Sequence, residues 1–242
     1  MTDSNDARAA DFPAVETAVR DLVDSIFSSL QTIADATRKL WDQLESTSAP
    51  PRAADLAGLR DVVVGELRRH GTTFNGTGVV VADQLLSDSP RYLEWWRPEH
   101  THGGAAQKFT LDLNPNSEYF YDYTSMEWFA VPRDRNTSWV YGPYLDYTGV
   151  DLYVCTFAVP ITSTGGTFLG VAAADVPVAA LDLKLLPTFT AGARPVALVN
   201  AEGRVIVANH ADHVTGSKIP KTDRLQGRAV PDTPWSLVPL NP

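Results

Sequence analysis

The sequence predicts an α+β fold in which long N-terminal helices pack on a mostly antiparallel sheet and a small β unit follows at the C-terminus. Three observations lead to this prediction. Apolar residues recur every three or four positions before residue 70, as in amphipathic helices. Short apolar or alternating runs of strand length dominate from Gly76 onward. Two further apolar runs flank a Glu202-Gly203 turn, which indicates a separate hairpin.

A first helix is expected over 12–46, because Gly and Pro are absent from 14 to 48. Its apolar positions fall on one face: Val15, Val19, Leu22, Ile26, Leu30, Ile33, Leu40 and Leu44. The stripe is long for a helix that covers a single domain, so we expect a homodimer formed through it. A single long helix packed on its own core is the alternative. A second helix is expected over 52–70, ending at Gly71.

The sheet strands are expected in two groups, with a short aromatic helix between them. That helix should run from Glu118 to Ala130 and stop before Pro132, which lacks a backbone N–H. A Gly165-Gly166 turn suits a hairpin between the last two sheet strands. The expected strands cover residues 78–83, 93–97, 108–113, 139–144, 152–161 and 167–175, and then 195–200, 204–208 and 235–240.

Composition excludes several classes of protein. The chain has 242 residues, is 44% hydrophobic and carries a net charge of −9, so a large core is expected and a basic nucleic-acid surface is not. The single cysteine, Cys155, permits neither an intrachain disulfide nor a cysteine zinc site. No apolar run is long enough to span a membrane, and the first residues do not form a signal peptide. With Met1 as the natural start, we expect a cytoplasmic protein with no membrane partner.

Motifs for catalysis are missing from the sequence, so we do not expect an enzyme. There is no Gly-x-Ser-x-Gly elbow, no phosphate-binding Gly-Lys-Ser/Thr loop and no His-Glu-x-x-His pair. The histidines at 100 and 102, and those at 210 and 213, lack an evident third ligand and are interpreted as parts of solvated loops. No metal and no cofactor are therefore expected.

The order of these elements resembles the Cache domain, a relative of PAS domains that senses small molecules. The resemblance is most specific at 141–146 (YGPYLD), 156–161 (TFAVPI) and 168–175 (FLGVAAAD). The hairpin at 197–205 resembles the opening of the second module of double-Cache proteins, here in reduced form. The resemblance implies a PAS-like sheet and three parts: N-terminal helices over 1–75, a ligand-binding module over 76–190 and a small C-terminal β unit over 191–242.

The same resemblance implies a set of ligand-binding residues. Cache domains that bind amino acids use an Arg and a Trp-Tyr pair on the inserted helix, a strand Tyr and an Asp that ends a later strand. In this sequence Met126 stands in the place of the Arg, while Trp128 and Phe129 stand for the Trp-Tyr pair. Tyr144 matches the strand Tyr and Asp175 matches the Asp. Neighbouring candidates for the same pocket are Tyr121, Tyr141, Asp146 and Trp96.

The exchange of Arg for Met126 changes the expected ligand. Without a guanidinium, a buried ligand carboxylate would lack a counter-charge, which is costly. Asp175 could still pair with an ammonium, and surrounding aromatic rings could add cation–π contacts. The expected ligand is therefore a small organic amine, and related amine-sensing Cache domains have a similar acidic and aromatic pocket. An amino-acid or carboxylate sensor is the alternative, and a dimeric interaction module with a vestigial pocket is another.

Simpler roles stay open for each candidate. Asp175 precedes Val176-Pro177 and could cap the next helix. Asp146 could be a turn residue, and the aromatic residues could be ordinary core. No output domain is evident, so a signal would pass through oligomerisation or to a separate signalling or regulatory protein.

Overall fold

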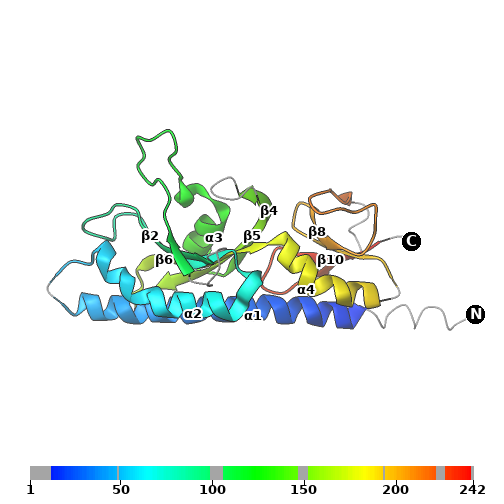
Figure 1. The fold of residues 1–242 in the computed structure, drawn as a ribbon, viewed down its shortest axis with the longest axis horizontal. Helices are drawn as coiled ribbons and strands as arrows, with labels where there is room; N and C mark the ends of the chain where they lie inside the picture. The colour runs from blue at the N-terminus through cyan, green and yellow to red at the C-terminus, as the bar shows by residue number, and fades with distance from the viewer. Residues whose placement is uncertain are drawn as a thin grey trace, which may run out of the picture. The chain divides into compact units, whose positions relative to one another are not determined.

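The structure, a computed structural model, describes residues 12–47, 49–98, 106–146, 152–192, 194–221 and 227–240. It divides into two compact units that are discontinuous in sequence. We call 26–141 with 156–176 the six-stranded unit, and the described residues of 1–25, 142–155 and 177–242 the four-stranded unit. The long N-terminal helix and the antiparallel sheets confirm the predicted α+β class (Figure 1). The expected limits at residues 75 and 190 stay predictions.

The first two helical regions lie close to the ranges that the sequence predicts. The first helix, α1, ends one residue before the expected limit, and the second expected helix divides into a 3-10 turn and α2. No helix within the described ranges is long and apolar enough to cross a bilayer. The helical elements are α1 (Phe12–Glu45), η1 (Ala53–Leu59), α2 (Arg60–His70), η2 (Gly71–Thr73), η3 (Tyr123–Ser125), α3 (Glu127–Arg135) and α4 (Val178–Ala191).

Six strands form the larger sheet in the order β3-β2-β1-β6-β5-β4. Strand β1 is central, and it pairs antiparallel with β2 on one side and β6 on the other. Registers place Thr77 opposite both Trp96 and Ala174. The strands are β1 (Gly76–Val81), β2 (Leu93–Pro98), β3 (Ala106–Phe109), β4 (Trp139–Asp146), β5 (Leu152–Thr162) and β6 (Phe168–Pro177).

The two faces of this sheet have different covers in the six-stranded unit. Helix α3 covers one face, which we call the α3 face, while α2 and the later part of α1 cover the other, which we call the α2 face (Figure 1). Side chains alternate between faces along each strand. The buried cluster on the α3 face contains Val80, Leu93, Trp95, Tyr123, Trp128, Phe129, Ala158, Val171 and Ala173. Strand residues that are two or four positions away from these residues therefore also point to the α3 face.

The four-stranded unit has its own sheet, in the order β8-β7-β10-β9. Its strands are β7 (Val196–Val199), β8 (Val205–Ala208), β9 (Arg228–Ala229) and β10 (Ser236–Pro239), with α4 packed on β8. The side chain of Asn209 joins these parts, because its Nδ2 donates to Phe189 O (2.6 Å) and its Oδ1 accepts from Val196 N (2.6 Å). The β7–β8 hairpin agrees with the expected hairpin over 195–208.

Two local expectations were wrong. The aromatic helix begins at Glu127 rather than Glu118 and includes Pro132. The chain before it turns instead, because Asp122 accepts from Thr124 N (3.2 Å) and caps the 3-10 turn η3. Strand β3 ends at Phe109, short of the expected end at residue 113.

Most of the apolar stripe of α1 is buried within the chain itself, and its Leu22, Leu40 and Leu44 are half-buried. Val19, Ile26, Leu30 and Ile33 have no exposed surface, and Trp41 is also buried. Burial in the core accounts for the length of the stripe, so the stripe no longer supports a homodimer. The homodimer stays a prediction without that argument.

Candidate functional site

The strongest site candidate from the sequence, Asp175, lies on the α3 face of β6. Asp175 follows Val171 and Ala173 by four and two residues, so its side chain points to the same face as theirs. Both of those residues belong to the buried cluster under α3. Asp175 is half-buried, and its Oδ1 accepts a hydrogen bond from Thr156 Oγ1 at 2.7 Å. A carboxylate at the edge of an aromatic cluster is suited to pair with a cation.

The interpretation of Asp175 as a helix cap is wrong. Helix α4 begins at Val178, its N-cap residue is Pro177, and no side chain caps it. Asp175 is still part of β6, where its carbonyl accepts from Asn75 N at 2.8 Å. The carboxylate is thus held by Thr156 on the neighbouring strand and not by the helix that follows.

A second charge on the α3 face was not recognised in the sequence. Arg97 follows Leu93 and Trp95 on β2 by four and two residues, so it points to the same face as these two cluster residues. Its guanidinium lies 3.6 Å from the ring centroid of Phe109. Gly76 pairs with Asp175 on one side, and a Cβ built on Gly76 would lie 3.2 Å from Arg97 Cγ on the other. Arg97 and Asp175 therefore flank Gly76, with their backbones two strand spacings, roughly 10 Å, apart.

The lack of a side chain at Gly76 makes room for the indole of Trp95. A Cβ at this position would overlap the indole nitrogen of Trp95 and lie 3.1 Å from its Cε2. The indole of Trp95 thus lies over the glycine, between the two charged strands. An aromatic side chain therefore covers the sheet at the glycine between Arg97 and Asp175.

Five more of the expected pocket residues meet on this face. Trp128 and Phe129 are buried in the cluster, and Tyr121, Met126 and Tyr141 pack against it partly buried. Phe129 is 1% exposed and contacts Tyr123 and Phe168, so it belongs to the core. Trp128 Nε1 is buried and meets no acceptor among the residues that the structure describes. A buried donor of this kind costs about 1–3 kcal/mol unless an acceptor reaches it.

Trp96, another candidate, lies on the α2 face, because neighbouring residues of a strand point to opposite sides. Its Nε1 donates to Glu94 Oε1 (2.9 Å), and the guanidinium of Arg60 on α2 lies over its ring. Glu94 is fully buried, and its Oε2 accepts from Lys108 Nζ (2.6 Å) and from the hydroxyl of Tyr92 (2.7 Å). Burial raises the pKa of Tyr92, so this network holds a neutral phenol beside the Glu94–Lys108 ion pair.

The remaining candidates, Tyr144 and Asp146, lie on β4 in the four-stranded unit. Tyr144 is half-buried, and Asp146 is 5% exposed as the last residue of the strand. The interpretation of Asp146 as a turn residue is therefore wrong. Ligand contact by these two residues stays a prediction.

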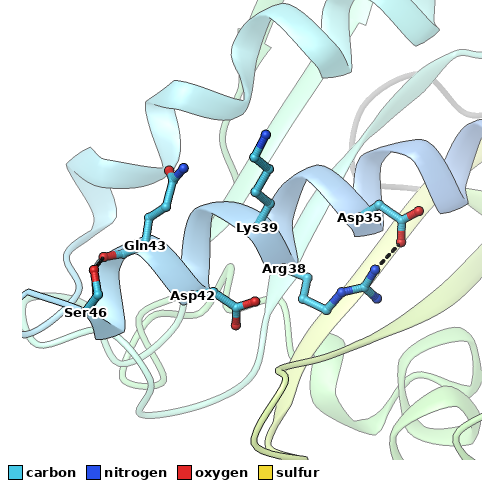
Figure 2. A pocket seen from close by; sticks show the side chains of 6 residues that line it. All are labelled: Asp35, Arg38, Lys39, Asp42, Gln43 and Ser46. Atoms are coloured by element: carbon cyan, nitrogen blue, oxygen red, sulfur yellow. Dashed lines mark hydrogen bonds and ion pairs between the residues drawn. The ribbon is translucent and has the colours of Figure 1, made fainter.

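Other places in the described ranges have fewer features of a binding or reactive site. A shallow hollow beside α1 is open to solvent, and α1 with the residue that follows it supplies the lining: Asp35, Arg38, Lys39, Asp42, Gln43 and Ser46 (Figure 2). No group of three or more His, Cys, Asp or Glu side chains that could hold a metal occurs in the part of the chain that the structure describes. Burial raises the pKa of the Cys155 thiol far above its usual range, which makes the thiol unreactive.

A family model and several solved structures match this chain. Residues 78–182 match the family model described as the first PDC sensor domain of methyl-accepting chemotaxis protein-like receptors. No curated protein matches the sequence of the chain.

Several solved structures are similar over nearly the whole chain. A methyl-accepting chemotaxis protein X has a TM-score of 0.62 at 18% identity, covering 95% of this chain and 97% of that one. The ligand-binding domain of the Campylobacter jejuni chemoreceptor Tlp3 with L-valine has a TM-score of 0.63 at 13% identity, covering 97% and 92%. The ligand-binding domain of Mlp24 with asparagine has a TM-score of 0.54 at 15% identity, covering 96% and 94%. The chain thus has the PAS-like fold of chemoreceptor sensor domains. The segment that matches the family model contains Arg97, Trp128 and Asp175, whereas Gly76 precedes it.

Proposed function

We propose that this protein is a sensor domain for a small apolar α-amino acid, bound on the α3 face between Asp175 and Arg97. The observation that carries the proposal is the sheet register, which sets one carboxylate and one guanidinium on either side of Gly76. An α-amino acid has an ammonium and a carboxylate on one carbon. Each would meet a side chain of opposite charge.

The chemistry of the two charged side chains suits this assignment. Asp175 Oδ1 already accepts from Thr156, and a carboxylate has further lone pairs for an ammonium. Arg97 presents a planar fork that matches a carboxylate with two hydrogen bonds. Its guanidinium also stacks on the ring of Phe109, which orients the planar group.

The indole of Trp128 supports a ligand with an acceptor. Its buried N–H lacks a partner among the described residues, and a ligand carboxylate oxygen would satisfy it. The surrounding side chains of Trp95, Met126 and Phe109 are apolar or aromatic. A ligand side chain that is small and apolar would therefore be favoured over a charged one.

The chemoreceptor neighbours support the class of ligand without fixing its identity. Tlp3 is described in complex with L-valine, and Mlp24 with asparagine. Both ligands are α-amino acids, which agrees with a site that has one charge of each sign.

A simple amine is the second candidate, and Met126 favours it. This residue stands where amino-acid-binding Cache domains have their Arg, so the usual carboxylate partner is missing from α3. The amine would then pair with Asp175 and the aromatic rings alone. Arg97 distinguishes an amino-acid ligand from an amine, because an amine has no carboxylate that could accept hydrogen bonds from the guanidinium.

The test is calorimetry of the full chain with three compounds of the same shape. L-valine has both charges, isobutylamine lacks the carboxylate, and isovalerate lacks the ammonium. We expect L-valine to bind more tightly than either analogue by at least roughly tenfold, since each analogue loses one charge-assisted pair. Isobutylamine binding as tightly as L-valine assigns the site to amines instead. No binding by any of the three refutes the proposal and leaves an interaction module with a vestigial pocket.

A further inference from the structure

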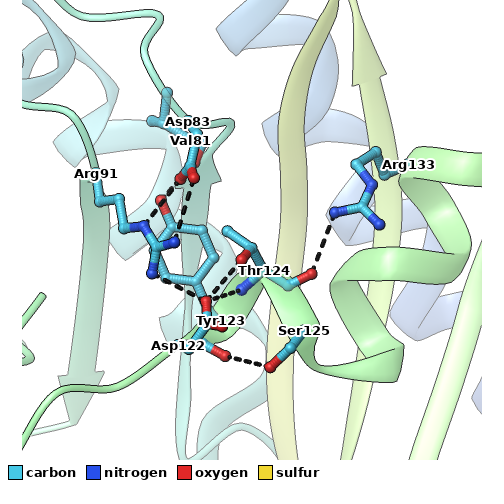
Figure 3. Close-up of polar contacts among 8 residues, drawn as sticks. All are labelled: Val81, Asp83, Arg91, Asp122, Tyr123, Thr124, Ser125 and Arg133. Atoms are coloured by element: carbon cyan, nitrogen blue, oxygen red, sulfur yellow. Dashed lines mark hydrogen bonds and ion pairs between the residues drawn. The ribbon is translucent and has the colours of Figure 1, made fainter. Parts of the chain in front are cut away.

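A cluster of polar contacts outside the site surrounds Arg91, which precedes β2 (Figure 3). Arg91 Nε lies 3.1 Å from Asp83 Oδ1, and its Nη1 donates to Asp122 Oδ1 at 2.9 Å. The guanidinium also lies over the rings of Phe120 (4.8 Å) and Tyr123 (5.8 Å). One side chain thus links the end of β1 to the chain that leads into α3.

Asp122 is charged where Arg91 contacts it. The Thr124 hydroxyl donates to its Oδ1 at 2.6 Å, and this bond, together with the charge of Arg91, holds the pKa of Asp122 below its usual range. The Tyr123 hydroxyl donates to Val81 O at 2.7 Å and is buried. The contacts therefore combine an ion pair at the surface with a buried hydrogen bond beneath it.

The chain held in this way packs on the α3 face, which also contains the candidate site. We call residues 120–126 the covering segment. Its Tyr121 and Met126 pack against the cluster on the α3 face, beside Trp128. Apart from the short turn η3, the chain from Thr110 to Met126 has no helix or strand of its own. Its position on the α3 face thus depends on side-chain contacts and a few backbone hydrogen bonds, and not on a sheet ladder.

We propose that Arg91 is a positioning residue for the ligand: it clamps the covering segment onto the β1–β2 connection and so keeps the site closed. The inference rests on the proposed ligand site. Opening of the segment exposes the ligand to water, and Arg91 sets how often this occurs. Apparent affinity falls in proportion to the fraction of molecules in which the segment is closed.

The first measurement needs no ligand. Amide hydrogen exchange of residues 120–126 is compared between wild type, Arg91→Lys and Arg91→Met. Arg91→Met removes both ion pairs, and we expect roughly tenfold faster exchange in this segment, a change typical of losing one charge-assisted contact. Arg91→Lys keeps the charge but cannot fork between Asp83 and Asp122, so its exchange should be intermediate.

The second measurement is the affinity for L-valine. We expect Arg91→Met to weaken binding by the factor by which its closed fraction falls, which is roughly tenfold once exchange of 120–126 reaches the rate of unprotected amides. Arg38→Met is a control for the same chemical change, because it removes an ion pair to Asp35 on α1. Val63→Ala is a control for general destabilisation, because Val63 is fully buried in α2. Both controls should retain wild-type affinity and wild-type exchange in the covering segment.

The outcomes separate the inference from the proposed function. Unchanged exchange of 120–126 in Arg91→Met refutes the clamp. Exchange of 120–126 at the unprotected rate together with an affinity like that of Val63→Ala also overturns the positioning role, because an open segment then leaves the ligand bound as before. Wild-type protein that binds none of L-valine, isobutylamine and isovalerate overturns the proposed function instead. The exchange rates still accept or reject the clamp in that case.

Discussion

Replacing Arg97 by Met should convert the specificity of the site. Met keeps an unbranched apolar chain over Gly76 and beside Phe109, where Arg97 Cγ and the guanidinium now lie. It removes the only charge of Arg97, and a lost partner of a buried charge pair typically costs about 2–5 kcal/mol. We therefore expect L-valine to bind at least roughly 30-fold more weakly. Isobutylamine, which has no carboxylate, should change by less than about threefold.

The assay is calorimetry with both compounds, together with thermal melts of each variant. Loss of the contact between Arg97 and Phe109 should lower stability by about 0.5–2 kcal/mol. Arg60→Met is the matched control, because Arg60 makes the same kind of contact with Trp96 on the α2 face. It should leave both affinities unchanged. A folded Arg97→Met protein with wild-type affinity for L-valine refutes the reasoning, and so does an equal loss for both compounds.

Two further substitutions test the structure around and beyond the site. Gly76→Ala places a Cβ against the Trp95 indole, so we expect weaker binding of L-valine and isobutylamine alike and a loss of about 1–3 kcal/mol in unfolding free energy; calorimetry and urea unfolding measure both, and wild-type affinity contradicts the placement of Trp95. Asp182→Asn concerns α4, where burial raises the pKa of the Asp182 carboxyl and penalises its charged form. The Asn variant should therefore be more stable than wild type at pH 7, and this gain should fade as the pH falls to the ordinary carboxyl pKa of about 3.9. A gain in urea unfolding that is equal at pH 7 and pH 4 shows that the charge is not its cause.

Elements with strong local signals were predictable from the sequence. Helix α1 has an uninterrupted apolar stripe, and β6 is an apolar run between a Gly turn and Asp175. The helix before Pro132 was misplaced, because aromatic residues over 118–126 suggest a helix while Asp122 turns the backbone through its own side chain. Local side-chain hydrogen bonds of this kind compete with helix formation and leave little trace in hydrophobic periodicity.

The candidate site was predictable in part. The resemblance to Cache domains selected Trp128, Met126 and Asp175, which the structure places on the α3 face or against its cluster. It could not select Arg97, because Trp95, Trp96 and Arg97 are adjacent and only the pairing with β1 tells which of them face α3. The spacing of two residues from Leu93 to Trp95 and Arg97 was the available sequence signal that Arg97 faces α3. The same spacing places Trp96 on the opposite face.

Asp175→Asn tests the central claim most directly. The Asn side chain can still accept the hydrogen bond from Thr156 Oγ1, so the fold should persist while the charge is lost. With calorimetry we expect L-valine to bind roughly 30- to 1000-fold more weakly, which corresponds to about 2–4 kcal/mol for an unpaired ammonium. Isovalerate, which has no ammonium, should bind as well as before or slightly better. A folded Asp175→Asn protein that binds L-valine with wild-type affinity would contradict the account, because no ligand ammonium could then pair with Asp175.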